Sequence, residues 1–177
     1  AAPAEPFVLV VDQSAGDCSI GLGQAGPESF RRMLQEALRD QPDCLVVVKV
    51  HPDVIRGRTR GHFPRQDLQH PRIRICADGL HPAALLEQAQ AVYVVTSQMG
   101  FEALLWGRNV HCFGMPFYAG WGLTRDRLLA PVRRGQSMPL DALVHAALVA
   151  GTRCVDPHRH QPCSIETLMD AIGLQRR

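Results

Sequence analysis

The chain has 177 residues, of which 46% are hydrophobic and 20% are charged. This composition is typical of a globular domain, and it excludes a disordered tail, a collagen-like fibre and a low-complexity array. Lysine and arginine together number 19 against 17 acidic residues, so the formal net charge is only +2. That balance argues against a dedicated nucleic-acid-binding protein, and we expect no nucleic acid among its partners.

Apolar runs alternate with amphipathic stretches along the chain. The continuous apolar run 7–11 predicts a strand that is buried on both faces, and largely apolar segments predict further strands at 44–50, 73–76, 91–95 and 110–113. Hydrophobic residues at helical spacing predict helices at 27–39, 81–90, 100–106, 139–150 and 165–174. The alternation predicts an α/β fold in which a Rossmann-like parallel sheet carries helices on both faces. We expect one such domain over 7–177, after a linker or boundary segment at 1–6.

Six cysteines occur without a CxxC pair, and most lie in or beside apolar runs. This pattern favours reduced thiols in a cytosolic protein over a disulfide framework. Cys154, His158, His160 and Cys163 lie within ten residues and include zinc-type ligands, but their spacing matches no common structural zinc finger. We recognise no signal peptide at the start of the sequence, and no apolar run approaches the roughly 20 residues of a membrane span.

The loops at the carboxyl ends of the predicted strands are the candidate binding sites, because parallel α/β sheets bind their ligands there. The loop after the first strand, 12–19, contains two aspartates, a glycine and two serines. Asp17 fits two interpretations: a helix cap in a polar turn, or a nucleophile that a substrate approaches closely beside Gly16. Asp12 lies nearer the strand, where we expect a carboxylate to bond backbone amides.

The loop after the second strand begins with the sequence KVHPD at 49–53. Pro52 ends the strand, and His51 stands at its exit. A histidine there could donate to a phosphate or protonate a leaving group, or it could bond only to backbone. The glycine- and arginine-rich segment 57–61 could cover an anionic ligand or form a solvated loop.

Two later loops carry further polar and aromatic residues. In the segment 96–104, two hydroxyl residues and a glycine precede a predicted helix, whose free N–H groups could bind a phosphate. Glu102 could cap that helix or accept hydrogen bonds from ribose hydroxyls. The segment 114–126 contains three aromatic residues and three glycines, and it could plug the sheet or form the wall of a sugar or nucleotide pocket.

The sequence PFYAGWGLT at 116–124, followed by Asp126, closely resembles the hallmark loop of the KpsC/LipA-type capsule polysaccharide proteins. These are bacterial β-Kdo glycosyltransferases. The resemblance covers about residues 7–170. It extends to three further motifs, which are Gln13-x-x-x-Asp17-x-Ser19, Lys49-x-His51-Pro52-Asp53 and Thr96-Ser97-x-x-Gly100-Phe101-Glu102-Ala103.

The resemblance implies a GT-B-like architecture, in which two Rossmann-like lobes face a cleft and this chain is the donor-binding half. It implies retaining transfer of Kdo from CMP-Kdo, without a metal cofactor, to a lipid-linked acceptor of the lysophosphatidylglycerol type during capsule linker synthesis and export. The implied location is cytoplasmic, peripheral to the inner membrane. Family modules are about twice this long, so the chain requires the rest of its module as a partner and need not be active alone.

The resemblance also assigns roles to single residues. Asp17 would form the covalent Kdo adduct, with Gln13 and Ser19 positioning it, and His51 would meet the CMP phosphate and assist its departure. Lys49 or a nearby arginine would pair with the Kdo carboxylate, and Glu102 would bind ribose. The complete set of implied donor-binding residues is Ser19, Lys49, Pro52, Thr96, Ser97, Gly100, Glu102, Tyr118 and Trp121.

An alternative class remains open, namely a non-catalytic nucleotide-sugar-binding or assembly module that needs a partner lobe. Asp17 discriminates poorly between this class and a transferase, since either could contain it. A sugar-nucleotide epimerase would need further carboxylates beside the sugar, and it would not account for the sequence at 116–124.

Overall fold

The structure is a computed structural model that describes residues 2–50, 52–76 and 82–175. Contacts between residues divide the chain into two compact units, of which the first ends at Ser137 and the second begins at Met138. The sequence predicted a single domain over 7–177. We describe each unit by itself.

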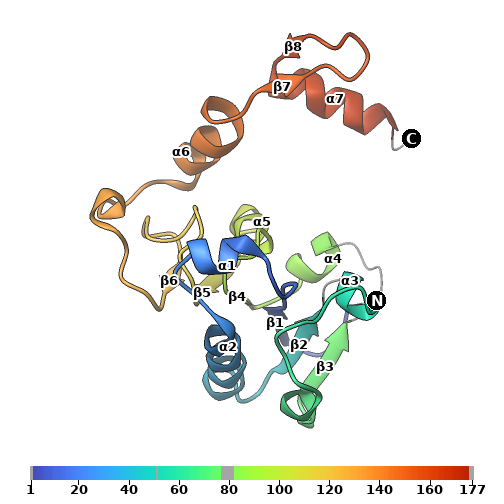
Figure 1. Cartoon of the computed structure of the whole chain (residues 1–177), viewed down its shortest axis with the longest axis vertical. Coiled ribbons are helices and arrows are strands. Elements are labelled where there is room, and N and C mark those ends of the chain that lie inside the picture. Colours follow the sequence, from blue (N-terminus) through green and yellow to red (C-terminus); the bar gives the residue numbers. More distant parts are fainter. Residues whose placement is uncertain (1, 51, 77–81, 176–177) are drawn as a thin grey trace. The chain divides into compact units, whose positions relative to one another are not determined.

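The first unit is built on a six-stranded sheet in which all neighbouring strands are parallel, in the order β3-β2-β1-β4-β5-β6 (Figure 1). The strands are β1 (Phe7–Val11), β2 (Leu45–Lys49), β3 (Ile73–Cys76), β4 (Ala91–Val94), β5 (Asn109–Cys112) and β6 (Arg125–Asp126). Every residue of β1 and β4 is buried, as their continuous apolar sequences predicted. The predicted Rossmann-like α/β fold is therefore confirmed.

Helices cover both faces of this sheet (Figure 1). They are α1 (Cys18–Leu22), α2 (Pro27–Asp40), α3 (Pro52–Ile55), α4 (Pro82–Leu86) and α5 (Met99–Leu105), with short 3-10 turns at Arg65–Leu68 and Val132–Arg134. Phe30 and Met33 of α2 pack into one core cluster with Val8 and Val10 of β1. The helix α5 contacts β4 and β5 and buries Phe101. Within the described ranges, no helix is long and apolar enough to cross a bilayer.

The second unit contains α6 (Leu140–Val144), a wider π turn (His145–Ala150), the antiparallel strands β7 (Cys154–Val155) and β8 (Pro162–Cys163), and α7 (Ile165–Gln175). The predicted helix 139–150 is thus half α-helix and half π turn. Cys154 lies opposite Cys163 in the hairpin, whereas His158 and His160 are exposed. Across the part of the chain that the structure describes, no three metal-ligating side chains gather into a cluster.

A buried titratable group, His111, lies on β5, next to the edge strand β6 of the sheet. His111 of β5 is only 4% exposed and stacks on Tyr93 of β4, with the ring centroids 4.3 Å apart. Burial, followed by the positive charges of Arg127 and Arg125, lowers the pKa of His111 to about 4, although Asp40 and Glu36 act in the opposite direction. The imidazole is therefore neutral in the folded protein at pH 7.

We predict that His111 makes the protein less stable in mild acid. The unfolded chain binds a proton at His111 near pH 6.5, whereas the folded protein does so only near pH 4, so the free energy of unfolding falls as the pH drops through this window. The shift corresponds to about 3 kcal/mol. Urea unfolding of wild type and His111→Gln between pH 7 and 4 checks this. The difference in free energy of unfolding between wild type and His111→Gln should change with pH across this window. A difference that stays constant would contradict the prediction.

Candidate active site

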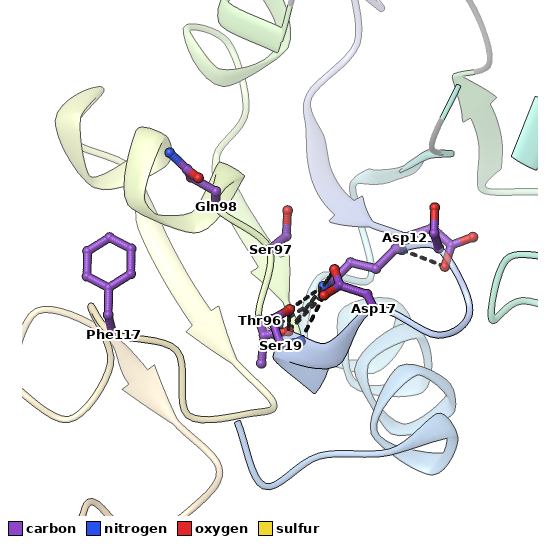
Figure 2. Close-up of a pocket in the computed structure, with 9 residues that line it drawn as sticks. Asp12, Asp17, Ser19, Thr96, Ser97, Gln98 and Phe117 are labelled. Atoms are coloured by element: carbon purple, nitrogen blue, oxygen red, sulfur yellow. Dashed lines mark hydrogen bonds between the residues drawn. The ribbon is translucent and has the colours of Figure 1, made fainter. Parts of the chain in front are cut away.

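A polar depression lies where the strand order of the sheet reverses. The chain proceeds from β1 to β2 on one side and from β4 to β5 on the other, and such switch points are where open α/β sheets bind ligands. The depression has a volume of about 420 Å³, and Figure 2 shows the side chains around it. It is lined by Asp12, Gln13, Ser14, Asp17, Ser19, Thr96, Ser97, Gln98 and Phe117.

The side chain of Gln13 connects the two loops that form the depression (Figure 2). Its Oε1 accepts a hydrogen bond from the backbone N–H of Thr96 at 3.0 Å. Its Nε2 lies 3.0 Å from Asp17 Oδ2, 3.1 Å from Thr96 Oγ1 and 3.3 Å from Ser19 Oγ. The Ser19 and Thr96 hydroxyls are also hydrogen-bonded to each other at 3.0 Å. One buried amide therefore orders three polar side chains from two different strand ends.

Asp17 is both a helix cap and an exposed carboxylate. Its Oδ1 accepts from the backbone N–H of Ser19 at 2.9 Å and caps α1, while its Oδ2 accepts from Gln13. Gly16 precedes it with φ of +88°, a conformation that glycine adopts without strain. Both interpretations of Asp17 from the sequence are consistent with this geometry, because the capping oxygen and the second oxygen are held by different donors.

Asp12 is the second carboxylate at the depression, and it is only 5% exposed. Its Oδ1 accepts from the backbone N–H groups of Gln13 at 2.8 Å and His62 at 3.1 Å. The expectation that Asp12 bonds backbone amides is therefore confirmed. Burial raises the pKa of the Asp12 carboxyl, and the hydrogen bonds from His62 and Gln13 oppose that shift without cancelling it.

Close backbone approaches hold the loop after β4 in place. The methyl group of Thr96 fits between two glycines: a Cβ on Gly114 would come within 2.8 Å of it, and one on Gly23 would overlap it. Ser97 Oγ accepts from the backbone N–H of Met99 at 3.3 Å, which leaves the hydroxyl hydrogen of Ser97 to donate elsewhere. A Cβ on Gly100 would collide with the Tyr118 hydroxyl.

The aromatic loop after β5 presents Phe117 to the depression, and Tyr118 lies beneath it. Phe117 is 45% exposed. Tyr118 is fully buried, its hydroxyl donates to the carbonyl of Ser97, and burial raises the pKa of this phenol well above its usual range. Trp121 is half-buried, and its Nε1 donates to the carbonyl of Phe117 at 2.8 Å. Tyr118 and Trp121 thus support the loop, whereas Phe117 is the residue that lines the depression.

The same aromatic loop is hydrogen-bonded within itself and to the segment that follows it. Asp126 accepts from the backbone N–H of Gly120 at 2.9 Å and from the Thr124 hydroxyl at 2.6 Å. Arg134 donates to the carbonyls of Pro116 at 2.5 Å and Ala119 at 3.1 Å. These bonds fix the backbone on both sides of Phe117.

The structure brings together five of the residues that the sequence predicted for the site, which are Gln13, Asp17, Ser19, Thr96 and Ser97. Lys49 is buried at the end of β2, where its carbonyl accepts from the Asp12 N–H at 2.9 Å. Glu102 is in the first turn of α5 and does not line the depression. Pro52 begins α3, and His51 lies outside the described residues. Sequence reasoning missed His62, which stands in no motif, and from the segment 116–124 it selected Tyr118 and Trp121 rather than Phe117.

The lining is suited to a ligand rich in hydroxyl groups. Serine and threonine hydroxyls both donate and accept hydrogen bonds, an exposed carboxylate can act as a nucleophile, and the Phe117 ring offers an apolar surface. The residues that line the depression in the described part of the chain include neither lysine nor arginine.

Comparison with known proteins identifies similar sequences and structures. Residues 1–153 match the family described as capsule polysaccharide biosynthesis protein. The capsule polysaccharide modification protein LipA of Neisseria meningitidis serogroup B is 37% identical over 99% of this chain and 26% of its own length. The lipopolysaccharide-processing protein LpsZ of Rhizobium meliloti is 37% identical over 96% of this chain and 38% of its own length.

A solved structure has the same fold as this chain. The KpsC β-Kdo 2,4 transferase of Thermosulfurimonas dismutans superposes with a TM-score of 0.88 at 39% identity, over 96% of this chain and 52% of that one. The β-Kdo 2,7 transferase of the same KpsC gives a TM-score of 0.80 at 28% identity, over 57% of its chain. The chain therefore spans about half of these solved chains, and about a quarter to two-fifths of the curated relatives.

We predict that Gly61→Ala destabilises the protein. A Cβ on Gly61 would collide with the Asp12 carboxylate, which is held by two backbone N–H groups, so the loop must shift at a cost of roughly 1–3 kcal/mol. Gly21→Ala is the matched control, because its Cβ meets nothing within 4 Å and alanine favours the helix by about 0.5–1 kcal/mol. Thermal unfolding of the two variants compares them, and equal melting temperatures would contradict the prediction.

Proposed function

This chain belongs to the capsule polysaccharide biosynthesis protein family, and from that membership we propose that it is the donor-binding part of a retaining β-Kdo glycosyltransferase. The proposed donor is CMP-Kdo, and the proposed acceptor is a lipid-linked acceptor of the lysophosphatidylglycerol type. One observation carries the proposal: an exposed, hydrogen-bonded carboxylate, Asp17, lines the depression at the switch point of the sheet. The 39% identity to a chain described as a β-Kdo transferase supports it.

The proposed reaction is a double displacement. An Asp17 oxygen attacks the anomeric carbon of Kdo, the bond from that carbon to the phosphate oxygen breaks, and CMP leaves with the electron pair. An acceptor hydroxyl then attacks the same carbon, displaces Asp17, and gives up its proton to a base in the completed site. Each step inverts the configuration, so two steps retain it. The bonds from Gln13 and Ser19 hold Asp17 in one orientation before the donor arrives.

The nucleotide would occupy the side of the depression formed by the loop after β4. The free hydroxyl hydrogen of Ser97 can donate to a phosphate, and the face of Phe117 can pack against a base. We propose Glu102 as a ribose ligand and His51 as the donor that assists the departure of CMP. A CMP-sugar has one phosphate rather than a diphosphate, so hydrogen-bond donors can balance its charge and we propose no metal cofactor.

The rest of the reaction depends on parts of the protein beyond this chain. We propose that the remaining part of the module supplies the acceptor lobe and the basic groups that pair with the Kdo carboxylate. A lipid-linked acceptor places the reaction at the cytoplasmic face of the inner membrane, where capsule linker synthesis precedes export.

A non-catalytic nucleotide-sugar-binding module is the second candidate, and one observation favours it. Asp17 caps α1 through Oδ1, and a module without turnover would need that cap as well. A variant that keeps the cap and removes the nucleophile therefore separates the two candidates.

We predict that CMP binds this chain in preference to UMP and ADP, and that EDTA leaves its affinity unchanged. The expectation follows from the proposed donor and from its single phosphate. Calorimetric titration of the three nucleotides, each with and without EDTA, measures this. Equal affinities for the three would contradict the cytidine assignment, and a loss of CMP binding in EDTA that Mg²⁺ restores would contradict the absence of a metal.

We predict that Asp17→Asn abolishes Kdo transfer by the full-length protein while leaving its CMP affinity near wild type and destabilising it less than Asp17→Ala does. Asparagine keeps the oxygen that caps α1 but is not a nucleophile, and its amide nitrogen cannot accept the hydrogen bond that Gln13 donates to Asp17 Oδ2. Asp17→Ala loses that bond and also the cap, which costs about 0.5–2 kcal/mol. Transfer assays, urea unfolding and CMP titration compare the variants. Mass spectrometry of wild type incubated with donor alone should locate a Kdo-sized increment on Asp17. Near-normal transfer by Asp17→Asn, or an increment elsewhere, would refute the nucleophile assignment.

A further inference from the structure

The backbone of Gln13 is held as firmly as its side chain, and a second residue does this. The Gln13 N–H donates to Asp12 Oδ1 at 2.8 Å. The Gln13 carbonyl oxygen lies 2.9 Å from His62 Nδ1. A carbonyl oxygen can only accept, so Nδ1 of His62 carries the hydrogen and donates it. His62 is 49 residues from Gln13 in the sequence, and it is the side chain that fixes this carbonyl.

Two further contacts and burial determine the position of the His62 ring. Its own backbone N–H donates to Asp12 Oδ1 at 3.1 Å. Its ring stacks on Phe30 of α2, with centroids 3.8 Å apart and planes within 6°, and Phe30 is fully buried. Its side chain is only 9% exposed. The ring therefore lies between the hydrophobic core and the backbone of Gln13.

The chain around His62 is also fitted to the loop after β1. The carbonyl of Arg60 accepts from the Ala15 N–H at 2.7 Å. Gly61 lies directly against the Asp12 carboxylate, where a Cβ has no room. Three consecutive residues, 60–62, thus contact the segment 12–15 through one backbone–backbone hydrogen bond, one hydrogen bond from the His62 N–H to the Asp12 carboxylate, one close approach and the His62 side chain. The contact is continuous, so a displacement of His62 would move the loop that carries Asp17.

We propose that His62 is a positioning residue for the reaction: its Nδ1–H holds the Gln13 carbonyl, and Gln13 in turn holds Asp17 toward the anomeric carbon. The inference rests on the proposed function, because it assigns His62 a part in the step that Asp17 performs. His62 does not line the depression and touches no substrate. Its effect reaches the reaction through one hydrogen bond to backbone and one from the Gln13 amide to Asp17.

Two substitutions separate the hydrogen bond from the packing. Asparagine places an amide N–H near the position of Nδ1 but cannot stack, so His62→Asn keeps the donor and loses the ring. Phenylalanine stacks on Phe30 but donates nothing, so His62→Phe keeps the ring and loses the donor. Phe63→Leu is the matched control, because Phe63 packs edge-on against Phe30 with centroids 6.1 Å apart, and it loosens the same cluster without touching Gln13.

In the full-length protein we expect His62→Phe to lower kcat about 10- to 100-fold, as a small misplacement of a reacting group does, with KM for the donor within about twofold of wild type. His62→Asn should recover most of kcat despite a lower melting temperature, and Phe63→Leu should lower the melting temperature without changing kcat. The opposite ranking, with His62→Phe active and His62→Asn inactive, would show that His62 serves packing alone and would overturn the proposal.

A second measurement does not depend on Kdo transfer. The Ser19 N–H donates to Asp17 Oδ1, so its hydrogen exchange reports the position of the Asp17 carboxylate. We expect faster exchange in the peptide around Ser19 for His62→Phe, and unchanged exchange for His62→Asn and Phe63→Leu. Unchanged exchange in His62→Phe would overturn the positioning role. If wild type transfers no Kdo while the exchange pattern holds, the proposed function fails and the positioning of Asp17 by His62 stands.

Discussion

The site depends on a single buried amide that bonds across the switch point of the sheet. The backbone pairing between β1 and β4 stops at the ends of these strands. It therefore does not hold together the two loops that follow them. Gln13 replaces that pairing, because it accepts from the Thr96 backbone and donates toward Asp17, Ser19 and Thr96. A buried amide is costly unless its hydrogen bonds are made. The arrangement that satisfies Gln13 is also the one that orients the polar groups of the depression.

Small residues around this amide allow the loops to approach one another closely. Gly23 and Gly114 leave room for the Thr96 methyl, and Gly61 leaves room for the Asp12 carboxylate. None of the three has a positive φ, so it is the missing side chain and not an unusual backbone conformation that matters. These contacts fix the positions of two lining residues, Asp12 and Thr96, although the three glycines themselves lie outside the lining.

The sequence predicted five of the six strands of this sheet, because each of the five lies in a short, largely apolar segment between predicted helices or loops. The run 91–95 became β4 (Ala91–Val94), and 73–76 became β3 (Ile73–Cys76) without change. Short elements were missed: α1 has five residues, of which two are serine and glycine, and β6 has two residues that pair only with β5. The family motifs located Gln13 and Asp17. They could not separate Phe117 from Tyr118, since adjacent residues of a loop have no periodicity to say which one is buried. His62 follows an arginine- and glycine-rich segment that carries no motif, and only the folded chain brings it to Gln13.

Hydrogen bonds within the protein hold the aromatic loop after β5, because Asp126, Arg134 and Tyr118 bond its backbone and that of Ser97. A loop that must become ordered when a ligand binds loses conformational entropy, at about 1–2 kcal/mol for each residue fixed. Here folding has already paid that cost, so Phe117 and its neighbours can receive a ligand with little rearrangement. The stability of the fold and the affinity of the site are therefore coupled: weakening the bonds that hold this loop would transfer an entropic penalty from the folding reaction to the binding reaction.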